Sequence, residues 1–506
     1  MTSRRIRLID PQSRPGRPFN PWITRWPGLG PITLASWLER SGYDVSVYNE
    51  NLSGPLPENP EAWAEFLEAD VIGISIMTPT ARRGYELADS LREANPRATL
   101  VLGGVHASFM PDEAAQHADV VVRGEAENII DAIAAGEITS GIHMPGPLED
   151  MDRLPTINHS LLRDFDRLLV GVAGKDNYEL PMMTSRGCPY GCTYCSVTRM
   201  FGRKVRRQSV EKVHADLRHH AGKGFRRLFF YDDNFTSNRP WTRELLQRMR
   251  PMNMRFNAQA RVDFHWADRK RTRLDRQLLR DLRRGGGNVL YVGYETISEE
   301  TANRWKKGYS GENPLPKRLA EDTRILHDAG LWVHGMFVFG PEHTRRDAQN
   351  IVEFCRSNEI ESIQISILTP LPGTSMMNEF GQHLVFDRFP QDWDYFDGSH
   401  CVYNHGQMGV EETQQAILDA HKSFYRWGGL SVRRLRGLLE GQGGSMNKLR
   451  HFWVNATRAR STLTAWQRET AEFLASARER LMDVGRLPLL AGTDHAENVP
   501  IPIGAD

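Results

Sequence analysis

The chain has 506 residues, and its 64 Lys and Arg side chains are nearly balanced by 63 Asp and Glu, which gives a formal net charge of +1. This balance argues against a general polyanion binder held by bulk charge, and the 40% hydrophobic content excludes a mainly disordered chain. No stretch approaches the roughly 18 apolar residues of a membrane span, and the N-terminus lacks the apolar run of a signal peptide. We therefore expect a cytoplasmic protein without a transmembrane segment.

Residues 1–144 alternate short apolar runs with stretches of helical periodicity, such as Arg82–Ala94. This alternation predicts a doubly wound parallel sheet, here a flavodoxin-like (Rossmann-type) domain. The expected strands are Ile6–Ile9, Val45–Tyr48, Val71–Ile76, Thr99–Leu102 and Val120–Val122. Gly103 and Gly104 follow the fourth strand, where glycine lets the backbone approach a ligand at the carboxyl edge of the sheet.

Residues 145–180 begin with several prolines and acidic residues and are interpreted as a linker. A second βα series follows in residues 181–385, and its six units predict a partial (β/α)6 TIM-type barrel, short of the closed eight. The expected strands are Met182–Ser185, Leu228–Tyr231, Arg255–Ala260, Val289–Gly293, Val333–Phe339 and Ile363–Leu368. Residues 386–506 start as an irregular aromatic segment and continue as a mostly helical region, which we expect to cap the substrate pocket.

Three of the five cysteines, Cys188, Cys192 and Cys195, are spaced Cys-x3-Cys-x2-Cys just after the first strand of the second series. Clustered thiols in a long chain favour a metal site over a disulfide framework. Three thiolates of one loop can ligate three irons of a [4Fe–4S] cluster and leave the fourth iron open. A structural zinc site is the alternative, but it needs a fourth ligand such as Cys355 or Cys401, and zinc loops usually bring paired Cys-x2-Cys units.

This cysteine loop, with an aromatic residue before its third cysteine, resembles the signature of radical S-adenosylmethionine (SAM) enzymes. Segments that match the same family follow in the expected order at Phe230–Phe235, Gln259–Arg261, Gly293–Thr296, Gly335–Glu342 and Thr369–Thr374. In front of the loop, Gly103–His106 and Arg123–Glu127 resemble the N-terminal domain of the cobalamin-binding branch. The chain is therefore similar to the cobalamin-binding (B12-binding domain) radical SAM superfamily.

The resemblance implies that Cys188, Cys192 and Cys195 ligate the cluster and that SAM chelates its open iron. The implied SAM contacts are Tyr194, Asp232, Asp233, Asn234, Gln259, Arg261, Glu295 and Gly335. The aspartates and the asparagine would receive the methionine ammonium, the arginine would pair with the carboxylate, and the glutamate would bind the ribose hydroxyls. Several of these residues have an alternative role: a helix N-cap run for the aspartates and the asparagine, salt bridges at the barrel mouth for the arginine and the glutamate, and a strand-end turn for the glycine.

For cobalamin the resemblance implicates Gly103, Gly104 and His106, the histidine reaching the lower face of the corrin. Residues 1–155 contain no Asp-x-His-x-x-Gly, the loop that gives many cobalamin proteins a histidine ligand to cobalt. The radical SAM branch commonly lacks this loop, so its absence does not argue against cobalamin. His106 can equally be an ordinary loop residue.

The expected activity is a C-methyltransferase, in which a 5′-deoxyadenosyl radical activates an unactivated carbon and methylcobalamin donates the methyl group. The alternative is a radical cyclase, ring-rearranging or C–C coupling enzyme acting on a lipid, tetrapyrrole or natural product. Either activity needs a small-molecule or lipid substrate and an electron donor of the flavodoxin or ferredoxin type.

A tRNA-modifying enzyme is a further alternative, raised by the basic run Asp268–Arg273. The methylthiotransferase type carries three more cysteines in its N-terminal domain, and residues 1–187 contain none. We interpret the run as a solvated helix face and do not expect a nucleic-acid substrate. A binding module without catalysis would leave the thiol cluster unexplained.

Overall fold

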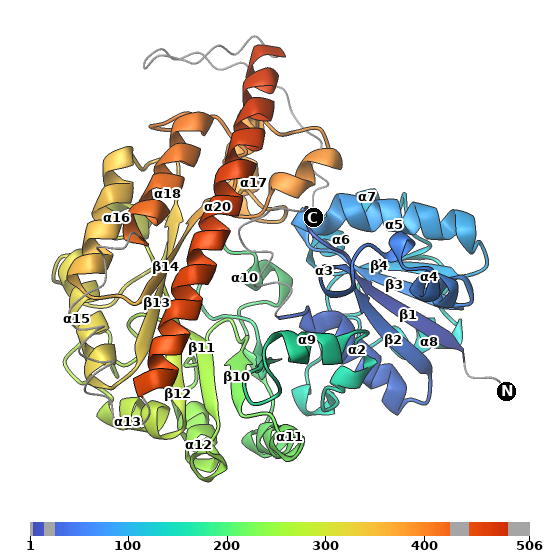
Figure 1. The fold of residues 1–506 in the computed structure, drawn as a ribbon, viewed down its shortest axis with the longest axis horizontal. Helices are drawn as coiled ribbons and strands as arrows, with labels where there is room; N and C mark the ends of the chain where they lie inside the picture. The colour runs from blue at the N-terminus through green and yellow to red at the C-terminus, as the bar shows by residue number, and fades with distance from the viewer. Residues whose placement is uncertain (1–3, 15–25, 426–444, 484–506) are drawn as a thin grey trace.

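The computed structural model describes residues 4–14, 26–425 and 445–483. Two parallel six-stranded sheets lie side by side, each with helices packed around it (Figure 1). The buried residues of both sheets and of the C-terminal region join in one continuous hydrophobic core. Among the described residues, no helix is both long and apolar enough to cross a membrane.

The N-terminal sheet has the strand order β2-β1-β3-β4-β5-β6, which confirms the flavodoxin-like prediction and adds one strand at the edge. Its strands are β1 Arg5–Asp10, β2 Asp44–Asn49, β3 Val71–Ser75, β4 Thr99–Gly103, β5 Val120–Val122 and β6 Gly141–His143. The helices are α2 Leu29–Arg40, α3 Glu50–Ser53, α4 Pro60–Leu67, α5 Ala81–Ala94, α6 Val105–Phe109, α7 Pro111–Ala114 and α8 Ile130–Ala135. β6 was missed because its residues are largely exposed and carry no apolar run.

Residues 145–180, interpreted as a linker, pack against both sheets. They contain α9 (Phe165–Gly171), which lies between the two sheets (Figure 1). Leu162 forms a parallel bridge with Val47 on the edge strand β2, and the Arg163 N–H donates to the Val47 carbonyl at 2.9 Å. The segment therefore continues the core between the sheets, and the exact residues at which one domain ends stay a prediction.

The second sheet has six parallel strands in the order β14-β13-β12-β11-β10-β7, which confirms the partial barrel. The strands are β7 Glu179–Met182, β10 Arg227–Phe230, β11 Arg255–Arg261, β12 Gly287–Glu295, β13 Trp332–Phe339 and β14 Ser362–Ile367. The helices are α10 Val197–Met200, α11 Val210–Gly222, α12 Arg239–Met249, α13 Arg276–Arg284, α14 Glu299–Arg304, α15 Leu315–Asp328, α16 Arg345–Ser357 and α17 Ser375–Phe380. The first strand begins three residues before its predicted start and ends at Met182, where the chain leaves the sheet to form a separate hairpin.

The C-terminal region contributes α18 (Val410–Phe424) and the long α20 (Ser445–Asp483), as its helical prediction expects. These two helices pack together, and the rings of His421 and Trp466 meet at 4.8 Å. The final residues 484–506 lie outside the described part of the chain.

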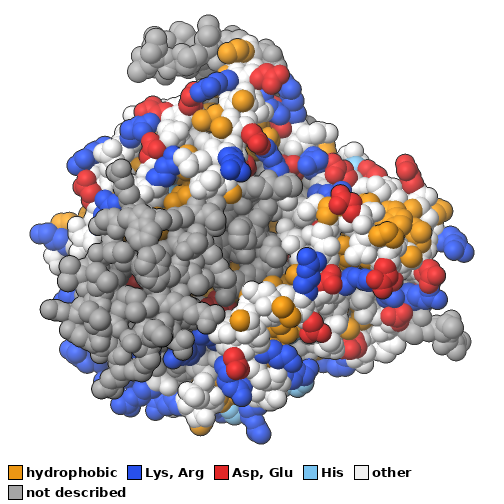
Figure 2. Space-filling model, in the orientation of Figure 1, with side chains coloured by type: hydrophobic (Ala, Val, Ile, Leu, Met, Phe, Trp, Pro, Cys, Tyr) orange, Lys and Arg blue, Asp and Glu red, His pale blue; other side chains and the backbone are white. Residues whose placement is uncertain are grey.

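The basic run Asp268–Arg273 is not the solvated helix face that we predicted. Its residues form turns, in which the Asp268 carboxylate accepts the Thr272 and Arg273 backbone N–H groups. Arg271 is turned inward and pairs with Asp322 at 2.7 Å. On the face shown in Figure 2, positive and negative side chains are interspersed, as the balanced composition indicates.

Candidate functional site

The cysteine loop leaves and rejoins a short antiparallel hairpin made of β8 (Ser185–Arg186) and β9 (Arg206–Arg207). Gly187 starts the loop with a φ of 94°, and a Cβ there would lie 2.7 Å from the Lys204 carbonyl oxygen. Only glycine fits this left-handed, crowded position. The loop folds back on its own base, and its three cysteines are free and partly exposed.

Buried ion pairs from the N-terminal domain hold the base of this loop. Glu125 and Glu127, just after β5, each accept a 2.6 Å hydrogen bond from the Arg186 guanidinium. Arg206, on the opposite strand of the hairpin, also pairs with Glu125. These four side chains are only 3–6% exposed. One acidic segment therefore grips both strands that flank the cysteines, a role for Glu125 and Glu127 that the sequence motif did not reveal.

The tip of the loop is held by the barrel. The Arg261 guanidinium carbon lies 3.9 Å above the Tyr190 ring, and its N–H groups donate to Asp263 and to the Lys307 and Gly308 carbonyls at 3.1 Å. Burial alone would raise the pKa of Asp263, but the Arg261 charge and the Ser310 hydrogen bonds outweigh it and lower the pKa to about 2. This anchored pair keeps the loop across the barrel mouth.

Two further contacts fix the middle of the loop. The Thr193 N–H donates to the Trp305 carbonyl at 3.1 Å, and the Ser375 hydroxyl donates to the Thr193 carbonyl at 3.0 Å. Tyr194 packs edge-on against Trp305 with ring centroids 5.5 Å apart. Its ring thus lies between the loop and the ends of the barrel strands, next to the expected cluster.

The surroundings of the thiols favour their protonated form as long as no metal is bound. Burial, the neighbouring Cys192 and Asp233 together raise the pKa of Cys195 to about 11, against a backbone N–H from Val197, and burial likewise raises that of Cys188. No three His, Cys, Asp or Glu side chains of the described residues converge on the position of a single metal ion. Three soft thiols on one loop match the donor set of an iron–sulfur cluster, whose positive irons favour the thiolate form.

The run after β10 contains two aspartates with different surroundings. Asp232 is buried and accepts hydrogen bonds from the Thr184 N–H at 3.1 Å, the Thr184 hydroxyl at 2.8 Å and the Ser185 hydroxyl. Asp233 lies beside the loop, where burial first and then the charge of Asp232 raise its pKa to about 7, opposed by the Gly187 N–H. Asn234 accepts the Thr236 hydroxyl at 3.2 Å. Asp233 is thus the acidic side chain of this run that faces the cysteines, and Asp232 anchors the chain leading to them.

Glu295 ends β12 at a bulge in the pairing with β13, with a φ of 58° that is unusual for a residue other than glycine. Its carboxylate pairs with the Lys307 ammonium at 2.6 Å. Register places Arg261 opposite Gly293, and a Cβ at Gly293 would lie 2.4 Å from the Glu295 carboxylate oxygen. Gly293 and Lys307 therefore shape this corner of the site, and the sequence reasoning assigned a role to neither.

Gln259 sits two residues before Arg261 on the same face of β11, opposite Tyr291. Gly335 does not join this group. It pairs with Val292 and Ile363, and the place of its missing side chain is bounded by Phe337, Ile360 and Tyr294. Because alternate residues of a strand face opposite sides, Gly335 faces the surrounding helices.

In the N-terminal domain, Gly104 follows β4 with a φ of 94°, and a Cβ there would meet the Ile76 carbonyl oxygen at 2.6 Å. His106 comes next on α6, but it is fully buried. Its Nε2 lies 3.2 Å from the Glu113 carboxylate, and its ring meets Trp393 of the C-terminal region at 4.9 Å. The structure thus does not bring His106 to an open surface that a corrin ring could cover.

The carboxyl ends of the two sheets nevertheless face each other. Phe109, at the end of α6, packs against Gly373 in the loop after β14, where a Cβ would be 2.3 Å from its ring. Arg82, at the start of α5, pairs with Asp394 of the C-terminal region. Ligands held at the carboxyl edge of each sheet would therefore lie on the same side of the molecule, near one another.

Comparison with protein families gives two matches. Residues 24–134 match the B12 binding domain, and residues 182–355 match the radical SAM superfamily. The first match contains Gly103, Gly104 and His106, and the second contains the cysteine loop and every residue singled out above for SAM.

Among curated proteins, the chain is 26% identical over 440 residues to bacteriochlorophyllide d C-12(1)-methyltransferase of Chlorobaculum tepidum, covering 85% of this chain and 89% of the relative. It is 24% identical to anaerobic magnesium-protoporphyrin IX monomethyl ester cyclase of Rubrivivax gelatinosus, covering 72% and 68%. Among solved structures, the methyltransferase TsrM of Kitasatospora setae, with cobalamin and a [4Fe–4S] cluster bound, matches with a TM-score of 0.63 at 14% identity, over 93% of this chain and all of that one.

Proposed function

The chain is a cobalamin-binding radical SAM enzyme, and from this premise we propose that it is a methyltransferase acting on an unactivated carbon of a small molecule. The observation that carries the proposal is that both domains hold the cysteine loop: the N-terminal domain contacts its base through Glu125 and Glu127, and the barrel contacts its tip through Arg261. A cluster with SAM, and a cobalamin, would each lie at the carboxyl edge of one sheet, on the side where the loop joins the two domains.

When bound, the cofactors supply a 5′-deoxyadenosyl radical, made from SAM at the reduced cluster, and a methyl group carried by cobalamin. The protein holds the cluster through Cys188, Cys192 and Cys195. Tyr194 packs beside it and, with Trp305, limits access of water to the loop.

We assign the SAM contacts as follows. The Asp233 carboxylate accepts the methionine ammonium, which would offset the raised pKa of this buried acid. Arg261 has five N–H groups, of which its contacts with Asp263, Lys307 and Gly308 occupy three, so two can donate to the SAM carboxylate. Glu295 keeps one carboxylate oxygen for the ribose while the other is held by Lys307.

Gln259 lines the same face of β11 below Arg261, where its amide can reach the bound SAM. Asn234 and Asp232 act by shaping the turn that presents Asp233. In the N-terminal domain, Gly103 and Gly104 allow the backbone to approach the cobalamin closely, whereas His106 packs against Trp393. An electron donor of the flavodoxin or ferredoxin type would reduce the cluster.

A radical cyclase is the second candidate, supported by the likeness to the Rubrivivax gelatinosus cyclase, which covers 72% of this chain. The relatives' names point to tetrapyrroles as a substrate class for either activity.

The first test is cofactor content after anaerobic reconstitution with iron, sulfide and cobalamin. We expect about four irons per chain for a single cubane cluster, and one cobalamin. Cys192→Ser should lose the iron and keep the cobalamin, whereas Cys355→Ser, which alters a buried thiol of α16, should keep both. Iron retained by Cys192→Ser, or no cobalamin in any sample, would contradict the proposal.

A further inference from the structure

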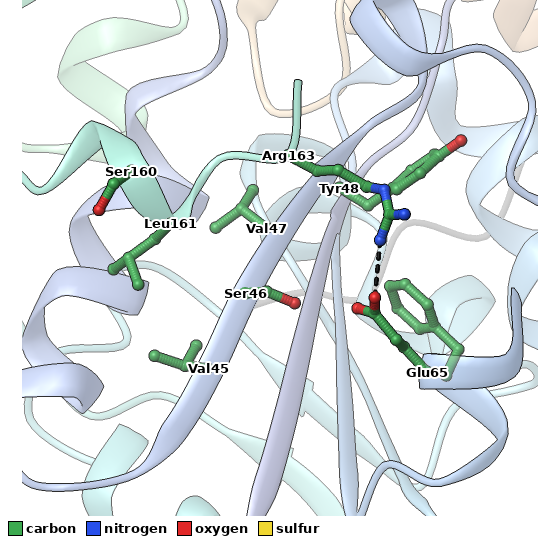
Figure 3. A pocket seen from close by; sticks show the side chains of 9 residues that line it. Val45, Ser46, Val47, Tyr48, Glu65, Ser160, Leu161 and Arg163 are labelled. Carbon is green, nitrogen blue, oxygen red and sulfur yellow. Dashed lines mark hydrogen bonds and ion pairs between the residues drawn. The ribbon is translucent and has the colours of Figure 1, made fainter. Parts of the chain in front are cut away.

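A cavity of about 640 Å³ lies where residues 157–169 pack against the C-terminal end of α11. This volume is within the range of small-molecule sites. No residue of the cysteine loop lines it. A smaller neighbouring cavity of about 250 Å³ shares Ser160 and Arg163 with it and is lined by β2 (Figure 3). There the Arg163 side chain is turned toward Glu65, to which it donates at 2.7 Å.

Two buried histidines form part of the cavity wall. The rings of His159 and His220 meet at 5.5 Å, and the two residues are 6% and 2% exposed. His159 Nε2 and His220 Nδ1 have no hydrogen-bond partner among the described residues. Burial, and next the charge of Lys223, lower the pKa of His159 to about 3, so the ring is neutral and offers one N–H donor. These two nitrogens are themselves buried, so they lower the stability of the fold and are not the ring atoms that a ligand in the cavity would meet.

Cations surround the entrance. Arg167, Lys175 and Lys223 are exposed lining residues, and none of them forms an ion pair within the part of the chain that the structure describes. Two carboxylates, Asp164 and Asp166, also line the cavity, so the three cations leave a positive excess. The free carbonyl groups of a helix C-terminus disfavour a nearby anion. In the last turn of α11, backbone N–H groups of residues 223–225 donate to these carbonyls, which reduces the repulsion.

Aromatic rings supply the apolar part of the wall. Phe165 stacks on His159 at 5.2 Å, and Phe225 lies 6.3 Å from Phe165. The Lys175 ammonium sits 5.8 Å above the Phe225 ring. Flat apolar surface next to a cationic rim matches a ligand that has both an aromatic or aliphatic body and a charged end.

We propose that this cavity binds a small organic oxyanion, a phosphate or carboxylate carried on an apolar body. The oxyanion meets Lys175, Lys223 and the imidazole N–H groups, and the body packs against Phe165 and Phe225. Because the wall joins the segment that pairs with β2 to α11 of the barrel, the ligand ties the two domains together. The inference is independent of the proposed activity at the cysteine loop.

The test is calorimetric titration of the full-length, reconstituted protein with phenyl phosphate, inorganic phosphate and phenol. We expect saturable binding of phenyl phosphate, weaker binding of inorganic phosphate and none of phenol. The double variant Lys175→Gln/Lys223→Gln should weaken phenyl phosphate binding about tenfold or more, since it removes two charged donors. Lys317→Gln, an exposed lysine on α15 away from the cavity, is the matched control and should change nothing.

His159→Phe separates binding from folding. Phenylalanine keeps the stacking on Phe165 and removes both ring nitrogens. Loss of the buried, unpaired Nε2 should hold or raise the thermal midpoint, whereas loss of the imidazole as a donor should lower phenyl phosphate affinity. Phenol binding as tight as phenyl phosphate, or affinity unchanged in the lysine double variant, would overturn the proposal. Free inorganic phosphate binding more tightly than phenyl phosphate would overturn the apolar part of it.

Discussion

Replacing Glu125 by glutamine should loosen the cysteine loop by breaking its link to the N-terminal domain. The carboxylate is 4% exposed and pairs with both Arg186 and Arg206, whose side chains are 6% and 3% exposed. The two guanidinium groups hold the pKa of Glu125 below its usual value despite burial, which acts to raise it. Glutamine fits the same space but leaves two buried positive charges facing the single carboxylate of Glu127.

Removing one partner of a buried ion pair typically costs about 3–5 kcal/mol, and no discount for solvent screening applies at this burial. A domain's total stability is only about 5–15 kcal/mol. The urea m-value of small proteins reaches about 3 kcal/mol per M and increases with chain length, so the unfolding midpoint should fall by up to about 1 M. Iron retention should fall with it, because Arg186 and Arg206 flank the cysteines.

The assay is anaerobic urea unfolding followed by circular dichroism, with iron content measured on the same samples. Glu149→Gln is the matched control, since it breaks an ion pair with Lys204 whose two side chains are both exposed. That variant should unfold at the wild-type midpoint. If Glu125→Gln had the same unfolding midpoint and the same iron content as the control, the inference that this network anchors the loop would be refuted.

Three further predictions address the site and the C-terminal region. Asp233→Asn should weaken SAM binding at least about tenfold, because it removes a charge-assisted contact, and should leave the iron content unchanged. Asp232→Asn should instead lower the unfolding midpoint. Equal SAM affinity in wild type and Asp233→Asn, measured by calorimetry, would count against the assignment of Asp233. Gly293→Ala, whose Cβ would strike the Glu295 carboxylate, should impair SAM binding. Gly335→Ala should cost about 1–3 kcal/mol of stability by overpacking and leave SAM affinity unchanged. Weaker SAM binding in Gly335→Ala and unchanged binding in Gly293→Ala would show that the two strand faces are misassigned. Burial acts to lower the pKa of His400, but Asp397 and Glu469 raise it to about 9, so its stabilising contribution is complete below pH 6.5 and disappears as pH rises through 9. Stability of wild type should thus fall over that window by an amount on the order of 3 kcal/mol, and His400→Gln should show a flat profile there.

The sequence was sufficient for the architecture because local patterns define it. Buried runs of branched residues such as Val120–Val122 predicted parallel strands, and the Cys-x3-Cys-x2-Cys spacing located the loop after the first barrel strand. The sequence also located Arg261 and Glu295 at strand ends that meet at the barrel mouth.

What could not be predicted depends on contacts between distant segments. Asp232 and Asp233 are adjacent in sequence. Only the hydrogen bond from Thr184 shows that the Asp232 carboxylate is bound by the protein's own groups, which leaves Asp233 for a ligand. The bulge before Glu295 places Gly293 in the site, and no periodicity signals it. His106 is buried by Trp393 of the C-terminal region, and the sequence around His106 does not predict this contact.

The central claim, that one site between the two domains serves SAM cleavage and methyl transfer together, is tested most directly by product analysis. Reconstituted protein with cobalamin, SAM and a low-potential reductant should form 5′-deoxyadenosine, from radical cleavage of SAM, and S-adenosylhomocysteine, which remains when SAM gives its methyl group to cobalamin. Cys192→Ser should form no 5′-deoxyadenosine. Formation of 5′-deoxyadenosine alone, with cobalamin fully bound, would contradict the methyltransferase and favour the cyclase.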